Sequence, residues 1–284
     1  MKNAIAFFTI CICLIAGNGN AKEKPQSLLW KITGKGLTTP SYLFGTIHMI
    51  CEDNYLFREK VTRAFDESEK LYFEINYDDP AEIAEMQKGM TSTGSWTNNL
   101  SPEKKARLED ALKKYYGMTI QQADKLSPSM MISYLSYKSV GCTKFRSYEM
   151  ELSKLAKSRN KPMGGLEKVA AQMDAIRQSY TPDDLVSQLS LTPEYTSLIA
   201  EAQKAYKAEE LDKVGELLND SRFMNPEIRK VSLDGRNQNW ADRIPALMQQ
   251  NTSFFAVGAA HLSGKKGLIQ LLRKKGYTVT PVLE

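Results

Sequence analysis

Residues 41–48, SYLFGTIH, lead from an apolar run into a glycine that is followed three residues later by a histidine, and residues 253–261, SFFAVGAAH, repeat the pattern. Both runs are rich in the apolar and aromatic residues that favour strands. A glycine at the end of a strand allows a tight turn and lets a ligand approach the backbone. The chain contains two histidines, His48 and His261, so we expect the two Gly-x-x-His motifs to do the same job in one shared site.

The segments around these two runs alternate between strand and helix patterns. Apolar or alternating runs predict strands, and apolar residues three and four positions apart predict helices. The turn at residues 34–40 makes residues 27–33 and 41–47 a predicted β-hairpin. The other expected strands are residues 70–76, 161–167, 253–257 and 277–282, and the expected helices are residues 55–67, 149–159, 168–178, 233–249 and 265–275. Strands that alternate with helices predict an α/β fold.

The middle of the chain, about residues 80–222, is expected to be mostly helical. A capping residue followed by proline at the first helical position marks a helix start. Five such pairs are Asp79-Pro80, Ser101-Pro102, Ser127-Pro128, Thr181-Pro182 and Thr192-Pro193. We expect residues 22–284 to form a single domain that includes this helical region.

The first 21 residues have the order of regions that is typical of a secretory signal. Lys2 precedes an apolar run over residues 4–16, and small residues follow as far as Ala21. The apolar run is shorter than a membrane span, so we expect export to the periplasm or the medium without an integral membrane segment. The rest of the chain carries 37 basic and 33 acidic residues. These charges are scattered and form no basic stripe, so nucleic acid is not an expected partner.

Two cysteines, Cys51 and Cys142, lie beyond the expected signal. An oxidising compartment favours a disulfide between them. Two buried thiols and a reactive Cys51 beside His48 are the alternatives, since sequence does not give the distance between the two residues.

Acidic residues end two of the other expected strands. Glu74 and Glu167 lie next to apolar neighbours, and ligands of open α/β sheets gather beyond the carboxyl ends of the strands. We therefore expect His48, Glu74, Glu167 and His261 at one rim. Two imidazoles and two carboxylates suit a divalent metal ion or a general-base pair. The alternatives are core histidines satisfied by hydrogen bonds and glutamates that are surface charges.

Two polar residues enter the apolar face of the expected helix 233–249. Asn237 shares a stripe with Trp240, and Arg236 lies one turn before Trp240 on the same side. A buried guanidinium needs a carboxylate or an anionic ligand. Arg236 is therefore a candidate for clamping Glu74, Glu167 or a reaction oxyanion, with a structural salt bridge as the alternative.

Together these segments resemble the TraB/PrgY/GumN family, which is related to the Tiki proteases. The resemblance runs from about Leu28 to the C-terminus. It rests on SYLFGTIH at 41–48, Leu166-Glu167 with Gln172, Arg236-Asn237 with Trp240, and VGAAHL at 257–262 followed by Gly264, Gly267 and Gly276-Tyr277. One position departs from it, because Glu149 stands where relatives are expected to have aspartate. No role is assigned to Glu149 for this reason.

The resemblance implies a central mixed β-sheet with a duplicated core. Tiki members are metal-dependent peptidases, other members are linked to peptide-pheromone shutdown, and erythromycin-esterase-like and haem-uptake relatives share the broader fold. Carried over, the resemblance marks His48 and His261 as the motif histidines, Glu74 as the acidic residue that ends the next strand, and Arg236 with Asn237 as the polar pair.

The leading hypothesis is an exported metal-dependent hydrolase, specifically a peptidase, that uses manganese, cobalt or zinc. In it His48, Glu74 and His261 hold the ion, Glu167 is a further ligand or base, and Arg236 stabilises the oxyanion. One alternative is a non-catalytic protein that binds a peptide or haem between the sheet rim and the helices. The other is a metal-free, esterase-like hydrolase with His48 as the base.

Overall fold

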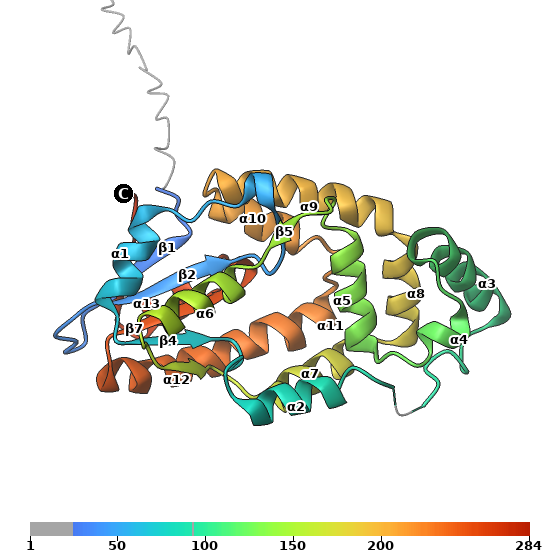
Figure 1. Cartoon of the computed structure of the whole chain (residues 1–284), viewed down its shortest axis with the longest axis horizontal. Coiled ribbons are helices and arrows are strands. Elements are labelled where there is room, and N and C mark those ends of the chain that lie inside the picture. The colour runs from blue at the N-terminus through green and yellow to red at the C-terminus, as the bar shows by residue number, and fades with distance from the viewer. Residues whose placement is uncertain (1–24, 93) are drawn as a thin grey trace, which may run out of the picture.

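A six-stranded sheet forms the centre of the fold in the computed structural model, which describes residues 25–92 and 94–284 (Figure 1). The expected secretory signal, residues 1–21, lies outside the described residues. The strands are β1 (Leu29–Thr33), β2 (Ser41–Thr46), β4 (Lys70–Phe73), β6 (Met163–Gly165), β7 (Ser253–Gly258) and β8 (Thr278–Pro281). Their order is β6-β4-β7-β2-β1-β8. β1 runs antiparallel to both of its neighbours and the other pairings are parallel, so the sheet is mixed as expected.

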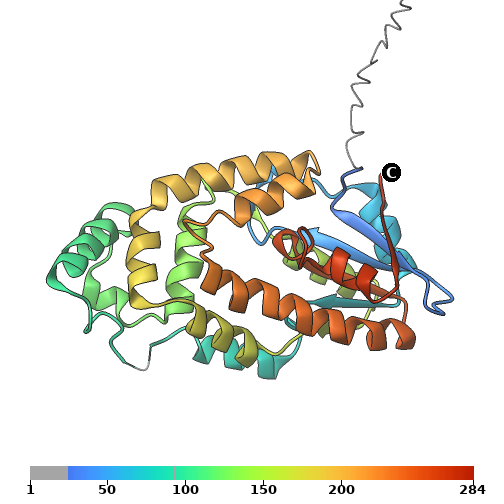
Figure 2. The ribbon, with the colours of Figure 1, turned by 180° about the vertical axis from the view of Figure 1, so that it is seen from behind.

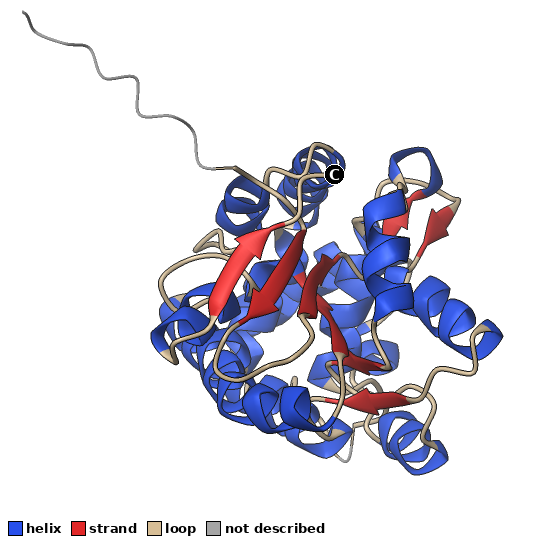
Figure 3. Ribbon diagram, turned by 90° about the vertical axis from the view of Figure 1, so that its left-hand side faces the viewer, coloured by secondary structure: helices blue, strands red, loops and turns tan. Residues whose placement is uncertain are grey.

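The two motif strands lie side by side in the middle of this sheet. β2 pairs in parallel with β7 from Tyr42↔Phe254 to Thr46↔Gly258. Helices α1 (Glu59–Glu67) and α6 (Tyr148–Ser158) cover one face, and α12 (Arg236–Gln250) and α13 (Leu268–Lys274) cover the other (Figures 2 and 3). Cover on both faces explains why these parallel strands are apolar along almost their whole length. Each motif strand continues through a helix into another parallel strand, as β2-α1-β4 and β7-α13-β8, in agreement with a duplicated core.

Several elements begin or end away from their expected positions. The helix expected over residues 55–67 begins at Glu59, after a 3₁₀ turn (Glu52–Asn54) and an extended stretch. The helix expected over residues 233–249 is α12, and helical structure already starts at α11 (Pro226–Arg229) and continues through a π-helical stretch (Lys230–Gly235). The side chain of Asn225 caps α11, so Asn225-Pro226 is a further capping pair that the sequence analysis missed.

The central region is helical, and four of the five expected caps are confirmed. The side chains of Asp79, Ser101, Ser127 and Thr181 accept hydrogen bonds from the first turns of α2 (Pro80–Lys88), α3 (Pro102–Ala111), α5 (Pro128–Lys138) and α8 (Pro182–Ser190). The prediction for Thr192 is wrong, because this residue lies inside α9 (Thr192–Lys207). Its hydroxyl donates to the carbonyl of Leu189 at 2.7 Å, so it ties α9 to the preceding helix.

The helical region has an apolar cluster apart from the core around the sheet. Leu108, Met131, Leu135 and Leu185 are among its fully or almost fully buried members. The remaining helical elements are a π-helical stretch (Leu112–Tyr116), α4 (Ile120–Ala123), α7 (Val169–Ser179) and α10 (Leu211–Leu218). The assignment of residues 22–284 to one domain stays a prediction. Within the described chain, no helix combines the length and the apolar character needed to cross a membrane.

A second sheet consists of two short strands that the sequence analysis did not predict. β3 (Ile50–Cys51) pairs antiparallel with β5 (Phe145–Arg146), and two-residue strands have no periodic pattern to reveal them. Beside this pair, Cys51 and Cys142 form a disulfide with 5.8 Å between their Cα atoms. Of the three possibilities that the sequence left open for these cysteines, the structure therefore shows the disulfide and excludes the two with free thiols.

Candidate functional site

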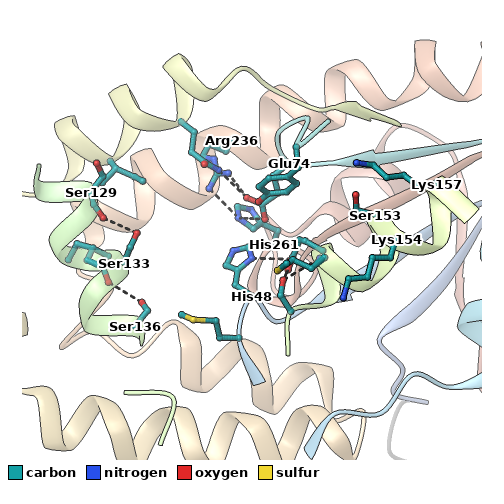
Figure 4. Close-up of a pocket in the computed structure, with 18 residues that line it drawn as sticks. His48, Glu74, Ser129, Ser133, Ser136, Ser153, Lys154, Lys157, Arg236 and His261 are labelled. Atoms are coloured by element: carbon teal, nitrogen blue, oxygen red, sulfur yellow. Dashed lines mark hydrogen bonds and ion pairs between the residues drawn. The ribbon is translucent and has the colours of Figure 1, made fainter. Parts of the chain in front are cut away.

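The carboxyl ends of four neighbouring parallel strands meet at one edge of the large sheet. β6, β4, β7 and β2 run in the same direction. Glu167, Glu74, His261 and His48 follow these strands within three residues. The structure therefore brings together all four residues that were expected at one rim, and Figure 4 shows three of them beside Arg236.

His48 faces the cavity, with 60% of its side chain exposed, and Glu149 at the start of α6 holds its ring from behind. His48 Nδ1 lies 3.0 Å from Glu149 Oε1. That carboxylate also accepts hydrogen bonds from the hydroxyls of Thr46, at 2.6 Å, and Ser147, at 2.9 Å. The negative charge of Glu149 raises the pKa of His48 to about 9. The unliganded imidazole is therefore protonated at neutral pH, and its Nε2 lies on the ring edge away from Glu149.

His261 is buried and in the opposite charge state. Its Nδ1 lies 2.6 Å from Asn237 Oδ1, while Asn237 Nδ2 donates to the carbonyl of Lys266 at 3.0 Å. Because an amide oxygen only accepts, the Nδ1 atom carries the proton, and the lone pair of Nε2 accepts a long hydrogen bond from Arg236 Nη1 at 3.4 Å. The ring also packs against Trp240, with 4.5 Å between ring centroids. Burial lowers the pKa of His261 to about 3, so this imidazole is neutral.

Arg236 joins the two glutamates, as the sequence analysis proposed. Its Nη2 donates to Glu74 Oε2 and to Glu167 Oε1, both at 2.6 Å, and its Nε donates to Glu167 Oε1 at 2.9 Å. Trp240 donates from its indole nitrogen to Glu167 Oε2 at 3.2 Å. All three charged side chains are nearly buried, so the guanidinium compensates two carboxylates in a region of low water content.

The two carboxylates of this cluster respond differently to their surroundings. Burial alone would raise the pKa of Glu74, but Arg236, both histidines and the N–H of Gly258 hold that pKa well below its usual range. Burial dominates at Glu167 and raises its pKa despite the contacts with Arg236. Of these two carboxylates, Glu74 is therefore the one whose ionised form its surroundings favour.

The two motif glycines make different close contacts. A Cβ atom at Gly45 would lie 3.1 to 3.2 Å from Leu262 and Ala259, so Gly45 lets the turn that carries His261 approach β2. A Cβ atom at Gly258 would lie 3.3 Å from Glu74 Oε1 and 4.0 Å from His48 Nε2. Gly258 thus keeps open the space between the side chains of Glu74, His48 and His261.

A cavity of about 710 Å³ opens above this group, between the sheet edge and helices α5, α6 and α7. Figure 4 shows the serines of α5 on one wall and the lysines of α6 on the other, with the histidines between them. Lining residues include Ser129, Ser133 and Ser136 from α5, Lys154 and Lys157 from α6, Gln172 from α7, and His48, Glu74, Arg236 and His261. Glu167 and Asn237 lie behind these residues. Glu167 contacts the lining residues Arg236 and Gln172, and Asn237 contacts His261.

The arrangement offers metal-binding atoms without a compact ligand cluster. In residues 25–92 and 94–284, no three His, Cys, Asp or Glu side chains are gathered closely enough, as they stand, to enclose an ion. His48 and His261 nevertheless each have Nδ1 engaged by another side chain. This leaves Nε2 of His48 for a ligand, while Nε2 of His261 has one long contact, to Arg236 Nη1 at 3.4 Å, which a ligand would have to replace. A hydrogen bond at the second ring nitrogen is the usual support of a metal-binding histidine.

Glu149 is the site residue that sequence reasoning set aside. It lies 101 positions from His48, and its position was discounted because relatives are expected to have aspartate there. One local signal was available, since Ser147 caps α6 and places Glu149 in its first turn. The helix dipole stabilises a carboxylate in a first helical turn, but nothing in that pattern names His48 as its partner.

The comparison with protein families agrees with the expected resemblance. The chain matches the model described as "TraB/PrgY/gumN family" over residues 28–281. No solved structure matches the chain.

Among curated proteins, several relatives are named metalloproteases. "Metalloprotease TIKI1" of Danio rerio is 24% identical over 96% of this chain and 69% of its own length. "Metalloprotease TIKI2" of Danio rerio is 24% identical over 91% of the chain and 61% of its own length. "Metalloprotease TIKI1" of Homo sapiens is 25% identical over 93% of the chain and 64% of its own length. The chain therefore spans roughly two thirds of the length of these relatives.

Proposed function

The chain belongs to the TraB/PrgY/gumN family, and we propose that it is an exported metal-dependent peptidase whose metal ion is held by His48, Glu74 and His261. One observation carries the proposal: two histidines with engaged Nδ1 atoms and one ionised carboxylate surround the open space at Gly258. The three relatives described above are named metalloproteases, which supports the same chemistry.

The residues present fit a divalent ion such as manganese, cobalt or zinc. Imidazole nitrogen and carboxylate oxygen are ligands for these metals. His261 is already neutral, and a metal ion at its Nε2 would replace the long hydrogen bond of 3.4 Å from Arg236 Nη1. Glu74 Oε1 is fixed by the N–H of Gly258 at 2.8 Å. His48 must lose the proton on Nε2 to become a ligand, while Glu149 keeps the proton on Nδ1. Metal binding should therefore release about one proton at neutral pH.

When bound, the ion would polarise the scissile carbonyl and lower the pKa of a water molecule. The chain's own residues prepare the site for this. Glu149 and Asn237 orient the two rings, and Arg236 turns Glu74 by holding Oε2 while Oε1 stays at the site. We assign to Arg236, which lines the cavity, the further role of stabilising the negative oxygen formed in peptide cleavage.

Glu167 has a supporting role in this proposal. Both of its oxygens accept hydrogen bonds, Oε1 from Arg236 and Oε2 from Trp240. With these partners it fixes the guanidinium and is poorly placed to abstract a proton from water. We therefore propose Glu167 as a positioning residue instead of a ligand or base.

Export of the chain rests on two independent features. The first 21 residues have the pattern of a secretory signal, and the disulfide between Cys51 and Cys142 is typical of an oxidising compartment. We propose cleavage after Ala21 and release to the periplasm or the medium. N-terminal sequencing of the protein from fractionated cells should find a mature chain that begins at Lys22.

The test uses protein purified without a histidine tag, since a tag would add metal ligands. Calorimetric titration with manganese, cobalt and zinc should show one site, and a peptide library should be cleaved only with the metal present. His48→Ala and Glu74→Gln should abolish both. Glu82→Gln is the matched control, because Glu82 is also a buried carboxylate that accepts from a backbone N–H, that of Val169, but away from the cavity.

Each alternative function has its own result in these experiments. A Soret band on addition of haem that is lost in both histidine variants would support a haem-binding protein. Tight peptide binding without turnover would support a non-catalytic peptide binder. Cleavage that survives complete chelation would contradict the metal site and support a metal-free hydrolase.

A further inference from the structure

The small β3-β5 sheet ends at the candidate metal site. β3 begins two residues after His48, and β5 ends three residues before Glu149. The antiparallel register pairs Ile50 with Arg146 and Cys51 with Phe145, and its continuation sets position 48 opposite position 148. One end of this ribbon therefore presents both members of the His48–Glu149 pair. Strands of two residues are weak by themselves, so something else must hold the ribbon together.

Two links close the other end of the ribbon. The first is the disulfide between Cys51 and Cys142. The second is the side chain of Gln203 from α9, which is 1% exposed. Its Oε1 accepts from the N–H of Cys51 at 3.0 Å, and its Nε2 donates to the carbonyl of Val140 at 2.9 Å. Val140 lies two residues before Cys142, so the amide and the disulfide join the same two segments.

We propose that the Cys51–Cys142 disulfide and Gln203 are positioning elements that hold His48 in place for metal binding through the β3-β5 ribbon. The inference rests on the proposed function for His48 as a ligand. Its consequence is that metal affinity, and with it activity, depends on an oxidised protein. In this scheme neither the disulfide nor the side chain of Gln203 touches the metal or the substrate. The β2-β7 core does not depend on either link.

The decisive experiment removes the disulfide in two ways. One is the double substitution of Cys51→Ser and Cys142→Ser. The other is reduction of the wild-type protein by a trialkylphosphine, which gives two electrons to the S–S bond and becomes the phosphine oxide with the oxygen of one water. The two protons of that water go to the two sulfurs. The phosphine is removed by gel filtration before metal is added.

Three readouts separate a positioning role from a general structural one. Hydrogen exchange of the backbone amides should accelerate at residues 46–51 and 145–149 and stay unchanged in β4 and β7. Affinity for manganese, cobalt or zinc should fall about tenfold, the size expected when a group that orients a ligand is lost. In the peptidase assay kcat should fall, and KM should change less. Reoxidation of the reduced protein should restore its metal affinity and its kcat.

Gln203→Leu should have the same direction of effect, and Gln188→Leu is its matched control. Gln188 is also a buried glutamine that donates to a backbone carbonyl, that of Phe223, at 2.9 Å, but it lies in α8 away from the ribbon. Unchanged amide exchange at both ribbon segments in all three perturbed proteins would overturn the proposal. If the oxidised wild type binds no metal, the proposed function fails, and hydrogen exchange still decides whether the two links order the ribbon.

Discussion

Substitution of Glu149 by glutamine should change the charge state of one histidine and leave the other unchanged. Glu149 raises the pKa of His48 from 6.5 to about 9, whereas burial lowers the pKa of His261 to about 3. Without the negative charge, the pKa of His48 should return toward 6.5. Because 60% of the His48 side chain is exposed, water screens the pair, and a fall of about one unit is the smallest effect we expect.

Ring C–H resonances of the metal-free protein, followed by NMR against pH, measure both values. Each of the two histidines gives one Cε1–H resonance, and the resonance that is lost in His48→Ala belongs to His48. The wild type should show one histidine that titrates near pH 9 and another that does not titrate above about pH 4. The electrostatic account of the site would be refuted by a wild-type His48 that titrates near pH 6.5. It would also be refuted if the pKa of His48 stays near 9 in the Glu149→Gln variant.

The raised pKa of His48 also makes the free energy of unfolding depend on pH, in a direction that the shift determines. The pKa of His48 is raised on folding, so its contribution to the free energy of unfolding is fully present below pH 6.5 and is lost as the pH rises to about 9. The difference in the free energy of unfolding between the wild type and Glu149→Gln should shrink across this window. Urea unfolding at pH 6 and at pH 9.5 measures it, and a difference that grows with pH would contradict the sign.

Three other substitutions test the remaining parts of the site. Asn237→Leu removes the acceptor of the His261 Nδ1–H, and calorimetry should show metal affinity lower by about 10- to 100-fold; an unchanged affinity would argue against His261 as a ligand. Gly258→Ala is compatible with the backbone at φ −52° and ψ 135°, but its methyl group would lie 3.3 Å from Glu74 Oε1. We expect loss of metal binding with a nearly unchanged urea midpoint, and retained binding would contradict the location of the ion. Arg236→Leu leaves Glu74 buried without its cation, so the free energy of unfolding should fall by about 3–5 kcal/mol, and a fall below about 1 kcal/mol in urea unfolding would show that the carboxylate is solvated.

The part of the site that could be predicted from sequence is the part encoded in local patterns. Apolar runs that end in glycine, followed by histidine, identified β2 and β7 and predicted His48 and His261 at their ends. Arg236 was predicted to pair with Glu74 or Glu167 because a charged residue on an apolar helical face needs a partner. Each of these inferences starts from a pattern within a few positions, either a strand that ends in glycine or a charge on an apolar helical face. The parallel sheet then brings the strand ends together, and Arg236 meets Glu74 from 162 positions away.

Glu149 and Gln203 could not be predicted in the same way. They meet His48 and Cys51 from 101 and 152 positions away, and the strands that guide the first of these contacts are only two residues long. A hydrogen bond between distant segments leaves no period in the sequence. The disulfide stayed open for the same reason, because pairing depends on a distance of 5.8 Å between Cα atoms that only the folded chain defines.

Local patterns were enough to identify which donor atoms the molecule has and which strands carry them, because strand and glycine signals involve neighbouring residues. The tertiary structure alone decided that two identical Gly-x-x-His motifs have histidines in opposite charge states. His48 is protonated because a carboxylate faces it at an exposed edge, and His261 is neutral because it is buried against Trp240 with an amide oxygen as its partner. A pKa depends on burial and on neighbouring charges, and neither is a property of the motif.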